Sequence, residues 1–300
     1  MTRATDARQD VLAGTNRPKS SVQSPPSTAH RPPSTLSVLV NLWRHRRLLW
    51  QFTVRNVELR HKGSHLGLVW SFLNPLLLLA LYVFVFGYIF GGRFHAEGEE
   101  SRIEYGMIVF LGLAIYHFVA EVISTSHALV VGNPNFVKKV VFPLEILPAS
   151  AVGTAVFHFG ITLGLVFIGA WLAGLNITAS ALWLPVILVP MVAMALGAAL
   201  LLSALGVFWR DVGHVMQFVL LALMFASAVF YPISKIPPEA WAILKFNPVI
   251  HLINEARNVT FWGSAPSTMH LAYLYACGLV ALLIGSAAFQ RLRGSFADVL

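Results

Sequence analysis

The sequence predicts an all-α integral membrane protein, and its composition is the first observation behind that prediction. Hydrophobic residues make up 57 % of the 300 residues, and charged residues make up only 11 %. Soluble domains carry about 25 % charged residues, so this chain cannot cover itself with a water-compatible surface. The other two observations are the length of the apolar segments and the placement of Lys and Arg between them.

Residues 1–35 are expected to form a disordered, basic tail. Four prolines lie among Ser and Thr between residues 20 and 34. Such a segment has too little apolar surface to offset the entropy cost of ordering. The residues after Met1 also lack the apolar core of a signal peptide.

Residues 36–65 are predicted to hold an amphipathic helix, up to about residue 60, that lies at the membrane interface. Spacings of three, four or seven place one set of apolar residues in a single stripe: Leu36, Leu39, Trp43, Trp50, Val54 and Val57. Trp together with Arg on an amphipathic helix suits the headgroup layer. Leu48, Phe52 and Leu59 lie off the stripe, which a helix held between the membrane and a partner protein would explain.

Residues 66–290 are predicted to contain six membrane-spanning helices, followed by a short tail at residues 291–300. Each apolar segment reaches the ~20 residues needed to cross a hydrocarbon core of about 30 Å. The segments are Leu66–Phe90, Tyr105–Val131, Ile146–Leu175, Leu182–Trp209, Val212–Tyr231 and Met269–Phe289. Prolines and aromatic residues in segment 232–266 predict two short re-entrant helices, and an amphipathic surface loop is the alternative.

The basic residues predict the orientation, because Lys and Arg are enriched in cytoplasmic loops. With the N-terminus inside, sixteen of the 21 basic residues fall inside, and five fall outside: Arg93, Arg102, Lys235, Lys245 and Arg257. Both termini are then cytoplasmic, and an acidic cluster from Glu97 to Glu104 lies outside. The net charge of +8 is therefore a topology signal, and no nucleic-acid partner is expected.

The sequence favours transport over catalysis. A phosphate-binding loop requires a pattern such as GxxxxGK[ST], and Lys62-Gly63-Ser64 has the wrong order. Cys277 is the single cysteine, so an intrachain disulfide is impossible. We expect the chain not to be an enzyme and to hold no catalytic constellation, metal or cofactor.

The second apolar segment carries a polar stripe. Phe110, Ala114, His117, Glu121 and Ser124 follow one another by four and three residues, so they share one helical face. A Glu facing lipid would be costly, which predicts that this face lines the bundle interior or a water-filled path. The stripe is either a translocation pathway or a place where a buried hydrogen bond to the Glu121 carboxylate holds helices together.

Four segments carry a resemblance to a known family. They are Arg60 to Gly67 with Trp70 and Asn74-Pro75; Asn133 through Phe142 and Glu145 to Pro148; Trp209-Arg210-Asp211; and Tyr231-Pro232 through Asn247-Pro248 and Arg257 to Gly263. Together they resemble type-2 ABC-transporter permeases, and among these the exporters of O-antigen, teichoic acid and related polysaccharides. The resemblance covers residues 36–290, with His61 where the family pattern has Tyr.

The resemblance implies a transmembrane subunit that forms a homodimer in the bacterial inner membrane. Two copies of a separate ATPase subunit would hold ATP and Mg and power export of a lipid-linked polysaccharide. The N-terminal helix and the loop between the second and third spans would contact that ATPase, through Arg55, Glu58, Arg60, Lys62, Phe136, Lys138, Lys139, Phe142 and Glu145. Segment 232–266 would form gate helices.

Aromatic residues add candidates for the substrate pathway. Tyr82, Phe86 and Phe90 recur every four residues in the first span, and Tyr231 lies at the outer end of the fifth. Sugar rings present C–H faces that stack on aromatic rings, so such a lining would let a polymer slide, although simple packing is the alternative. The competing functions are export of a drug or small lipid, a membrane-embedded glycan-lipid transferase, and a structural scaffold.

Overall fold

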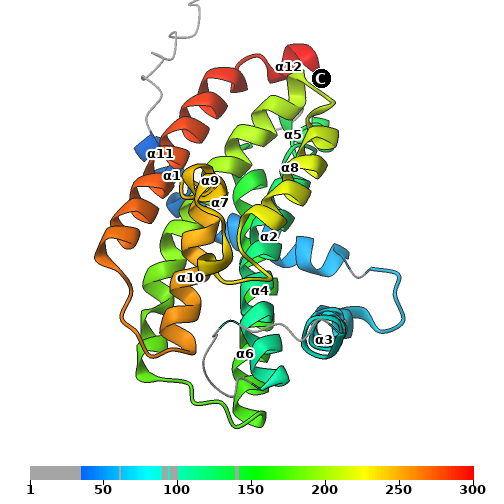
Figure 1. Ribbon diagram of the computed structural model, residues 1–300. Coiled ribbons are helices and arrows are strands. Elements are labelled where there is room, and N and C mark those ends of the chain that lie inside the picture. Colours follow the sequence, from blue (N-terminus) through cyan, green and yellow to red (C-terminus); the bar gives the residue numbers. More distant parts are fainter. Residues whose placement is uncertain (1–34, 61, 90–93, 95–100, 139–141) are drawn as a thin grey trace, which may run out of the picture. The chain divides into compact units, whose positions relative to one another are not determined.

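The computed structural model describes residues 35–60, 62–89, 94, 101–138 and 142–300, and every regular element in them is a helix (Figure 1). The all-α prediction is confirmed for this part of the chain. The predictions for the N-terminal tail, for Phe90 and Lys139, and for all of the acidic cluster except Glu104 lie outside the described residues.

Five helices in the described residues are long and apolar enough to cross a membrane. They are formed by α3 with η2 (Trp70–Tyr82 and Val83–Ile89), α4 (Arg102–Ser126), α6 (Ile146–Leu172), η3 with α7 (Ala179–Trp183 and Leu184–Phe208), and α11 with α12 (Thr268–Arg293 and Phe296–Val299). The shorter helices are α1 (Thr35–Arg44), α2 (Arg46–Arg60), η1 (Gly67–Val69), α5 (Pro134–Lys138), α8 (Val212–Ala226), η4 (Ile233–Lys235), α9 (Pro238–Leu244) and α10 (Pro248–Thr260).

The fifth predicted span is shorter than the sequence indicates. The apolar pattern extends to Tyr231, but α8 ends at Ala226 after 15 residues, which is about 22 Å of helix. Ala228 then takes a positive φ of 51°, and Asn247 donates hydrogen bonds to the Ala226 carbonyl and to Ser227, both at 3.0 Å. The prediction of six full-length helices is therefore wrong in this segment, and six crossings remain a prediction.

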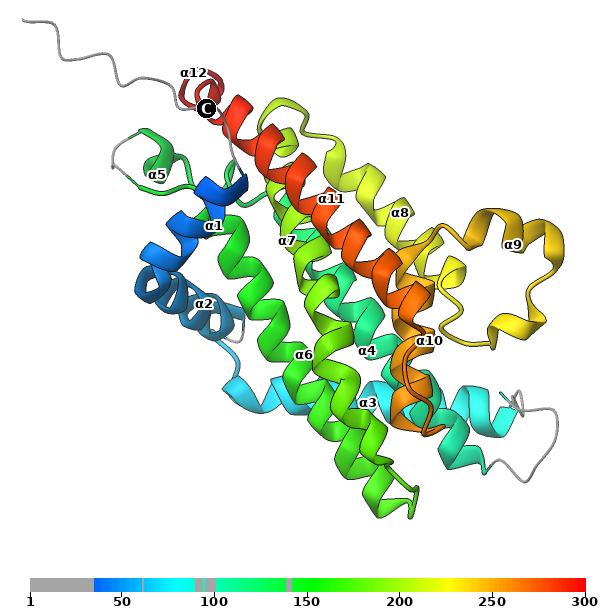
Figure 2. The ribbon, with the colours of Figure 1, turned by 90° about the vertical axis from the view of Figure 1, so that its left-hand side faces the viewer.

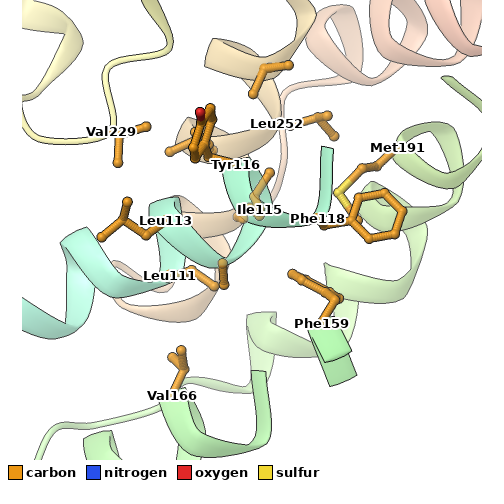
Figure 3. Packing of buried hydrophobic residues seen from close by; sticks show 14 of the residues in the cluster. Leu111, Leu113, Ile115, Tyr116, Phe118, Phe159, Val166, Met191, Val229 and Leu252 are labelled. Atoms are coloured by element: carbon orange, nitrogen blue, oxygen red, sulfur yellow. The ribbon is translucent and has the colours of Figure 1, made fainter. Parts of the chain in front are cut away.

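Helix α4 forms the centre of the main hydrophobic core. Ser101 caps its N-terminus, because the Ser101 Oγ accepts a hydrogen bond from the Glu104 amide at 3.1 Å. Most residues in the middle of the helix are buried. Figure 3 shows Phe118 of α4 beside Phe159 of α6 and Met191 of α7. The two phenyl rings meet edge to face with 5.8 Å between their centroids, a favourable geometry for aromatic pairs.

Helices α7 and α11 run side by side (Figure 2), and glycines set their separation. A Cβ atom at Gly285 would lie 2.0 Å from the Gly197 carbonyl oxygen, and one at Gly197 would lie 2.3 Å from the Ala281 backbone. Small residues let membrane helices approach this closely because they have no bulky side chain between the backbones. Such close packing matters in a membrane, because lipid offers no hydrophobic force to hold the helices together. Backbone contact therefore joins these two helices.

The N-terminal helix is divided at His45 into α1 and α2, and the predicted apolar stripe is partly buried and partly exposed. Val57 of the stripe is buried, as is Val38, which lies off it, whereas Trp43 and Trp50 of the stripe are 74 % and 68 % exposed. The location of this helix at the membrane interface remains a prediction. The exposed tryptophans remain available to the membrane interface.

Segment 232–266 contains the two predicted short helices. Every residue of α9 is at least partly exposed, whereas most of α10 is buried against α4 and α7. Asn247 begins α10 by accepting a hydrogen bond from the Val249 amide at 3.0 Å. Two helices are thus confirmed, and their re-entry into a membrane remains a prediction.

We expect Gly285→Ala to lower the melting temperature by several degrees, because the new methyl group would push against the Gly197 backbone. Overpacking of this kind costs about 1–3 kcal/mol. The matched control is Gly160→Ala, also within a spanning helix, where a Cβ atom meets nothing within 4 Å. Melting curves in detergent would measure both variants. Equal melting temperatures would contradict the tight contact between α7 and α11.

Candidate functional site

A cavity of about 660 Å³ lies beside α4, with walls from α2, α3, α4, α6 and α8. This volume is in the range of about 300–1,000 Å³ typical of ligand sites. The structure places the whole polar stripe of α4 on its wall: Phe110, Ala114, His117, Glu121 and Ser124. The periodicity of the sequence therefore identified most of the α4 side of the cavity, to which Leu113, Ala120 and Thr125 also contribute.

Glu121 connects three helices at this wall. Its Oε1 accepts a charged hydrogen bond from Arg60 at the end of α2, and it lies 2.8 Å from Nδ1 of His158 on α6. The Glu121 side chain is 17 % exposed and that of Arg60 is 53 % exposed. A carboxylate in an apolar bundle is stabilised by such partners. Glu121 therefore lines the cavity and joins helices, and its place on a translocation pathway remains a prediction.

Sequence reasoning missed the wall that α6 contributes. Thr154, His158 and Thr162 recur every four residues and all line the cavity. The same periodicity test that identified the stripe on α4 would have found them. Arg60, predicted from the resemblance at an ATPase contact, also lines the cavity.

The aromatic candidates divide between the cavity and an adjoining cluster. Tyr82 lines the cavity, whereas Phe86 stacks on Phe230 with 4.6 Å between ring centroids. Tyr82 completes the cluster at 5.9 Å from both rings. Tyr231 lies outside the cavity wall and donates a hydrogen bond of 2.5 Å to the Phe225 carbonyl. The sequence selected Tyr231, but its neighbour Phe230 makes the aromatic contact.

A phenylalanine cluster joins α2 to the loop between α4 and α6. Phe136 stacks on Phe142 with centroids 4.6 Å apart, and Phe52 lies 5.6 Å and 5.3 Å from these two rings. Phe52, which falls off the predicted apolar stripe, is therefore accounted for by this contact. Arg55 lies over the Phe52 ring at 5.7 Å. Of the other charged residues predicted at the ATPase contact, Glu58, Lys62 and Lys138 are also exposed.

Glu145 is buried, although the resemblance implies that it contacts an ATPase. Only 2 % of the residue is exposed. Its Oε1 accepts a hydrogen bond of 2.7 Å from Asn41, and Arg293 lies 3.4 Å from its Oε2. These contacts join α1, the start of α6 and the end of α11. An internal role thus accounts for Glu145, and its contact with a partner remains a prediction.

Arg257 is buried, although the loop count places it among the outside basic residues. It is 2 % exposed and donates hydrogen bonds to the carbonyls of Ile108, Ala228 and Val229 at 3.1, 2.9 and 2.5 Å. No carboxylate in the described part of the chain lies within ion-pair distance of its guanidinium. The loop count treated Arg257 as exposed, and its position among the buried residues of α10 was what sequence reasoning missed.

The described residues do not bring together three or more His, Cys, Asp or Glu side chains that could hold a metal ion. The cavity beside α4 instead offers a mixture of aromatic rings, hydroxyl groups, imidazoles and one ion pair. Such a lining can stack on apolar faces and exchange hydrogen bonds with polar groups.

Residues 47–261 match the ABC-2 type transporter family. The chain belongs to this family. An O-antigen export system permease protein, RfbA, from Klebsiella pneumoniae is 26 % identical over 267 residues, covering 89 % of this chain and 100 % of the relative. RfbA from Myxococcus xanthus is 27 % identical, covering 86 % of this chain and 96 % of the relative. The polysialic acid transport protein KpsM from Escherichia coli is 25 % identical, covering 79 % of this chain and 90 % of the relative.

In this ABC-2 chain we expect Glu121→Gln to reduce the free energy of unfolding by about 1–2 kcal/mol. A fully buried pair would cost about 3–5 kcal/mol, but the Arg60 side chain is half exposed. Arg60→Glu alone should also lower the free energy of unfolding. The double variant Arg60→Glu with Glu121→Arg should recover most of the stability that Arg60→Glu loses, because the ion pair re-forms. Thermal melting of the two variants and Arg60→Glu alone would test this. A double variant no more stable than Arg60→Glu would contradict the pairing.

Proposed function

We propose that this chain is the membrane-spanning, non-catalytic subunit of an ABC exporter that moves a lipid-linked polysaccharide of O-antigen type across a bacterial inner membrane. The observation that carries the proposal is the mixed aromatic and polar wall of the cavity beside α4. The proteins described above as similar are named for O-antigen export and polysialic acid transport, which supports this cargo over a drug or small lipid.

The chemistry of the wall suits a sugar polymer. The rings of Tyr82 and Phe110 offer flat apolar surfaces, which pair with the C–H faces of sugars. His117, Glu121 and Ser124 offer polar groups at helical spacing along the same wall, and sugar hydroxyls can exchange hydrogen bonds from one of these to the next. No single group then holds the polymer tightly, so it can advance.

ATP hydrolysis on a separate subunit would reach this wall through α2. The phenylalanine cluster and the exposed charges on its two elements, Arg55 and Glu58 of α2 and Lys138 of α5, form a candidate docking surface for two ATPase copies, which would carry ATP and Mg. Arg60 ends α2 and is bound to Glu121 on the cavity wall. A force applied to α2 would therefore act on the wall directly.

Contacts between the two ends of the described chain support six crossings with both termini in the cytoplasm. The Thr35 and Ser286 hydroxyls lie 2.7 Å apart, and Gln290 donates a hydrogen bond of 2.8 Å to Ser37. Helix α1 precedes the first span and these residues of α11 end the last one, so their contact supports an even number of crossings with both ends on the same side of the membrane. Five long helices with the shorter α8 satisfy that condition.

The exposed faces support a homodimer. In α3, Ser71 is buried and the other described side chains are partly or fully exposed, including Leu76, Leu77 and Leu81. Large exposed apolar surfaces mark contacts with membrane or protein. A second copy together with lipid would cover them.

The first test is the ATPase rate of the chain purified in lipid, alone and with the ATPase subunit encoded beside it. The proposal predicts no hydrolysis by the chain alone. It predicts hydrolysis that responds to lipid-linked glycan in a complex of two copies of each subunit. If no complex forms and the isolated chain converts a glycan-lipid, a transferase is supported instead.

We expect Lys138→Glu to weaken binding of the ATPase subunit about tenfold, which is about 1.4 kcal/mol, because it reverses an exposed charge beside the phenylalanine cluster. Lys235→Glu is the matched control, since Lys235 is also an exposed lysine but lies in segment 232–266. Affinity between the two subunits would be measured with both variants. Equal affinities would exclude Lys138 from the docking surface.

A further inference from the structure

A second, smaller cavity adjoins the larger one where α4 ends and α8 begins. Its volume is about 170 Å³, roughly ten times the ~15 Å³ that one water molecule requires. It is lined by Ser124, His127, Arg210, Gly213, His214 and Gln217. Ser124 also lines the larger cavity, so the two spaces share a wall.

The side chains around this cavity favour an anion. Arg210 and two histidines contribute to the lining, which holds no acidic residue. Among the described residues, no carboxylate lies within ion-pair distance of Arg210, whereas Arg60 in the larger cavity is neutralised by Glu121. Asp211 is exposed and lies outside the lining. The positive charge of Arg210 is therefore available to a ligand.

The start of α8 adds a partial positive charge, because the aligned peptide dipoles make the N-terminal end of a helix positive. The Val212 and His214 amides already donate hydrogen bonds to the Trp209 and Asp211 carbonyls, at 3.4 and 3.0 Å. Asp211 occupies the N-cap position but accepts no capping hydrogen bond through its side chain. Phosphate groups bind at helix N-termini of this kind.

His127 supplies a second, independent indication of a polar ligand. Its Nδ1 is buried and has no hydrogen-bond partner among the described residues. A Cβ atom at position 213 would lie 2.5 Å from its Nε2, so Gly213 allows the ring to lie against the first turn of α8. Buried polar atoms are nearly always hydrogen-bonded, so the missing partner of this nitrogen indicates an unfilled polar position beside the cavity.

We propose that this smaller cavity binds the phosphate or diphosphate ester that joins the lipid to the glycan. The inference rests on the proposed function, because that function supplies a lipid-linked substrate. It adds a place where the charged junction is held while the sugar chain occupies the larger cavity. The planar guanidinium of Arg210 can donate two parallel hydrogen bonds to one phosphate.

The test uses the full chain in nanodiscs of phosphatidylcholine, titrated with a short-chain polyprenyl diphosphate. The parent alcohol, inorganic pyrophosphate and phosphatidylglycerol are the comparison ligands. We expect the diphosphate to bind, the alcohol not to bind, and Arg210→Gln with His214→Gln to weaken binding at least about tenfold, or 1.4 kcal/mol. Both residues are exposed, so the fold should tolerate their substitution.

Arg291→Gln is the matched control, because Arg291 is also exposed and lies outside the cavity lining. Arg210→Lys keeps the charge and should retain more affinity than Arg210→Gln, even if the double variant proves unstable. Equal affinity in wild type and Arg210→Gln would overturn the site. Equal binding of phosphatidylglycerol or inorganic pyrophosphate would overturn its assignment to the substrate junction. Glycan-stimulated ATP hydrolysis by the wild-type complex reports separately on the proposed function, so the two can fail independently.

Discussion

The arrangement of the described helices depends on one buried arginine. Arg257 donates hydrogen bonds to carbonyls of Ile108, Ala228 and Val229, and the last two belong to the break that follows α8. A backbone carbonyl removed from water needs a donor, and within a membrane only the protein can supply one. The arginine allows α8 to stop early and α10 to pack against α4. Phe94 faces the guanidinium at 4.5 Å, which adds a cation–π contact. Gly112 leaves room for this side chain, because a Cβ atom there would lie 2.4 Å from Nη2.

Acidic residues are rare in this chain, and three of them join helices. Glu121 connects α2, α4 and α6, and Glu145 connects α1, α6 and α11. Glu255, which is 1 % exposed, lies 2.6 Å from His270 Nδ1 and accepts a hydrogen bond of 3.1 Å from the Ser267 amide at the start of α11. Because an unpaired carboxylate in an apolar interior is costly, each of these contacts restricts how its helices can move. The cavity wall is therefore held by polar contacts at points where apolar packing alone would permit sliding.

The periodicity of the sequence predicted the features that depend only on neighbouring residues of one helix. The stripe from Phe110 to Ser124 needed only the helical repeat, and all its members share one wall. Contacts between distant residues could not be predicted in this way. Arg60 meets Glu121 across 61 positions, and Arg257 meets Ala228 across 29. The end of α8 depends on the second contact, so hydropathy extended that helix too far. Periodicity placed Val57, Trp43 and Trp50 on one stripe of the N-terminal helix, but only packing against the bundle determines that Val57 is buried while the two tryptophans are exposed.

The described structure also separates a rigid half from one that could respond to a partner. Glycine contacts join the backbones of α7 and α11, and backbone atoms cannot yield as flexible side chains do. Helix α2, by contrast, is attached through side chains: Phe52 to the loop with Phe136 and Phe142, and Arg60 to Glu121. Side-chain contacts can change rotamer and re-form, whereas interlocked backbones cannot. If an ATPase docks at the phenylalanine cluster, its motion would therefore be taken up by α2 and passed to Glu121, while α7 and α11, which contribute no residue to the cavity lining, would stay in place. A polymer beside the moving polar wall would be displaced along the cavity, which is the mechanical requirement of an exporter whose energy source lies on another subunit.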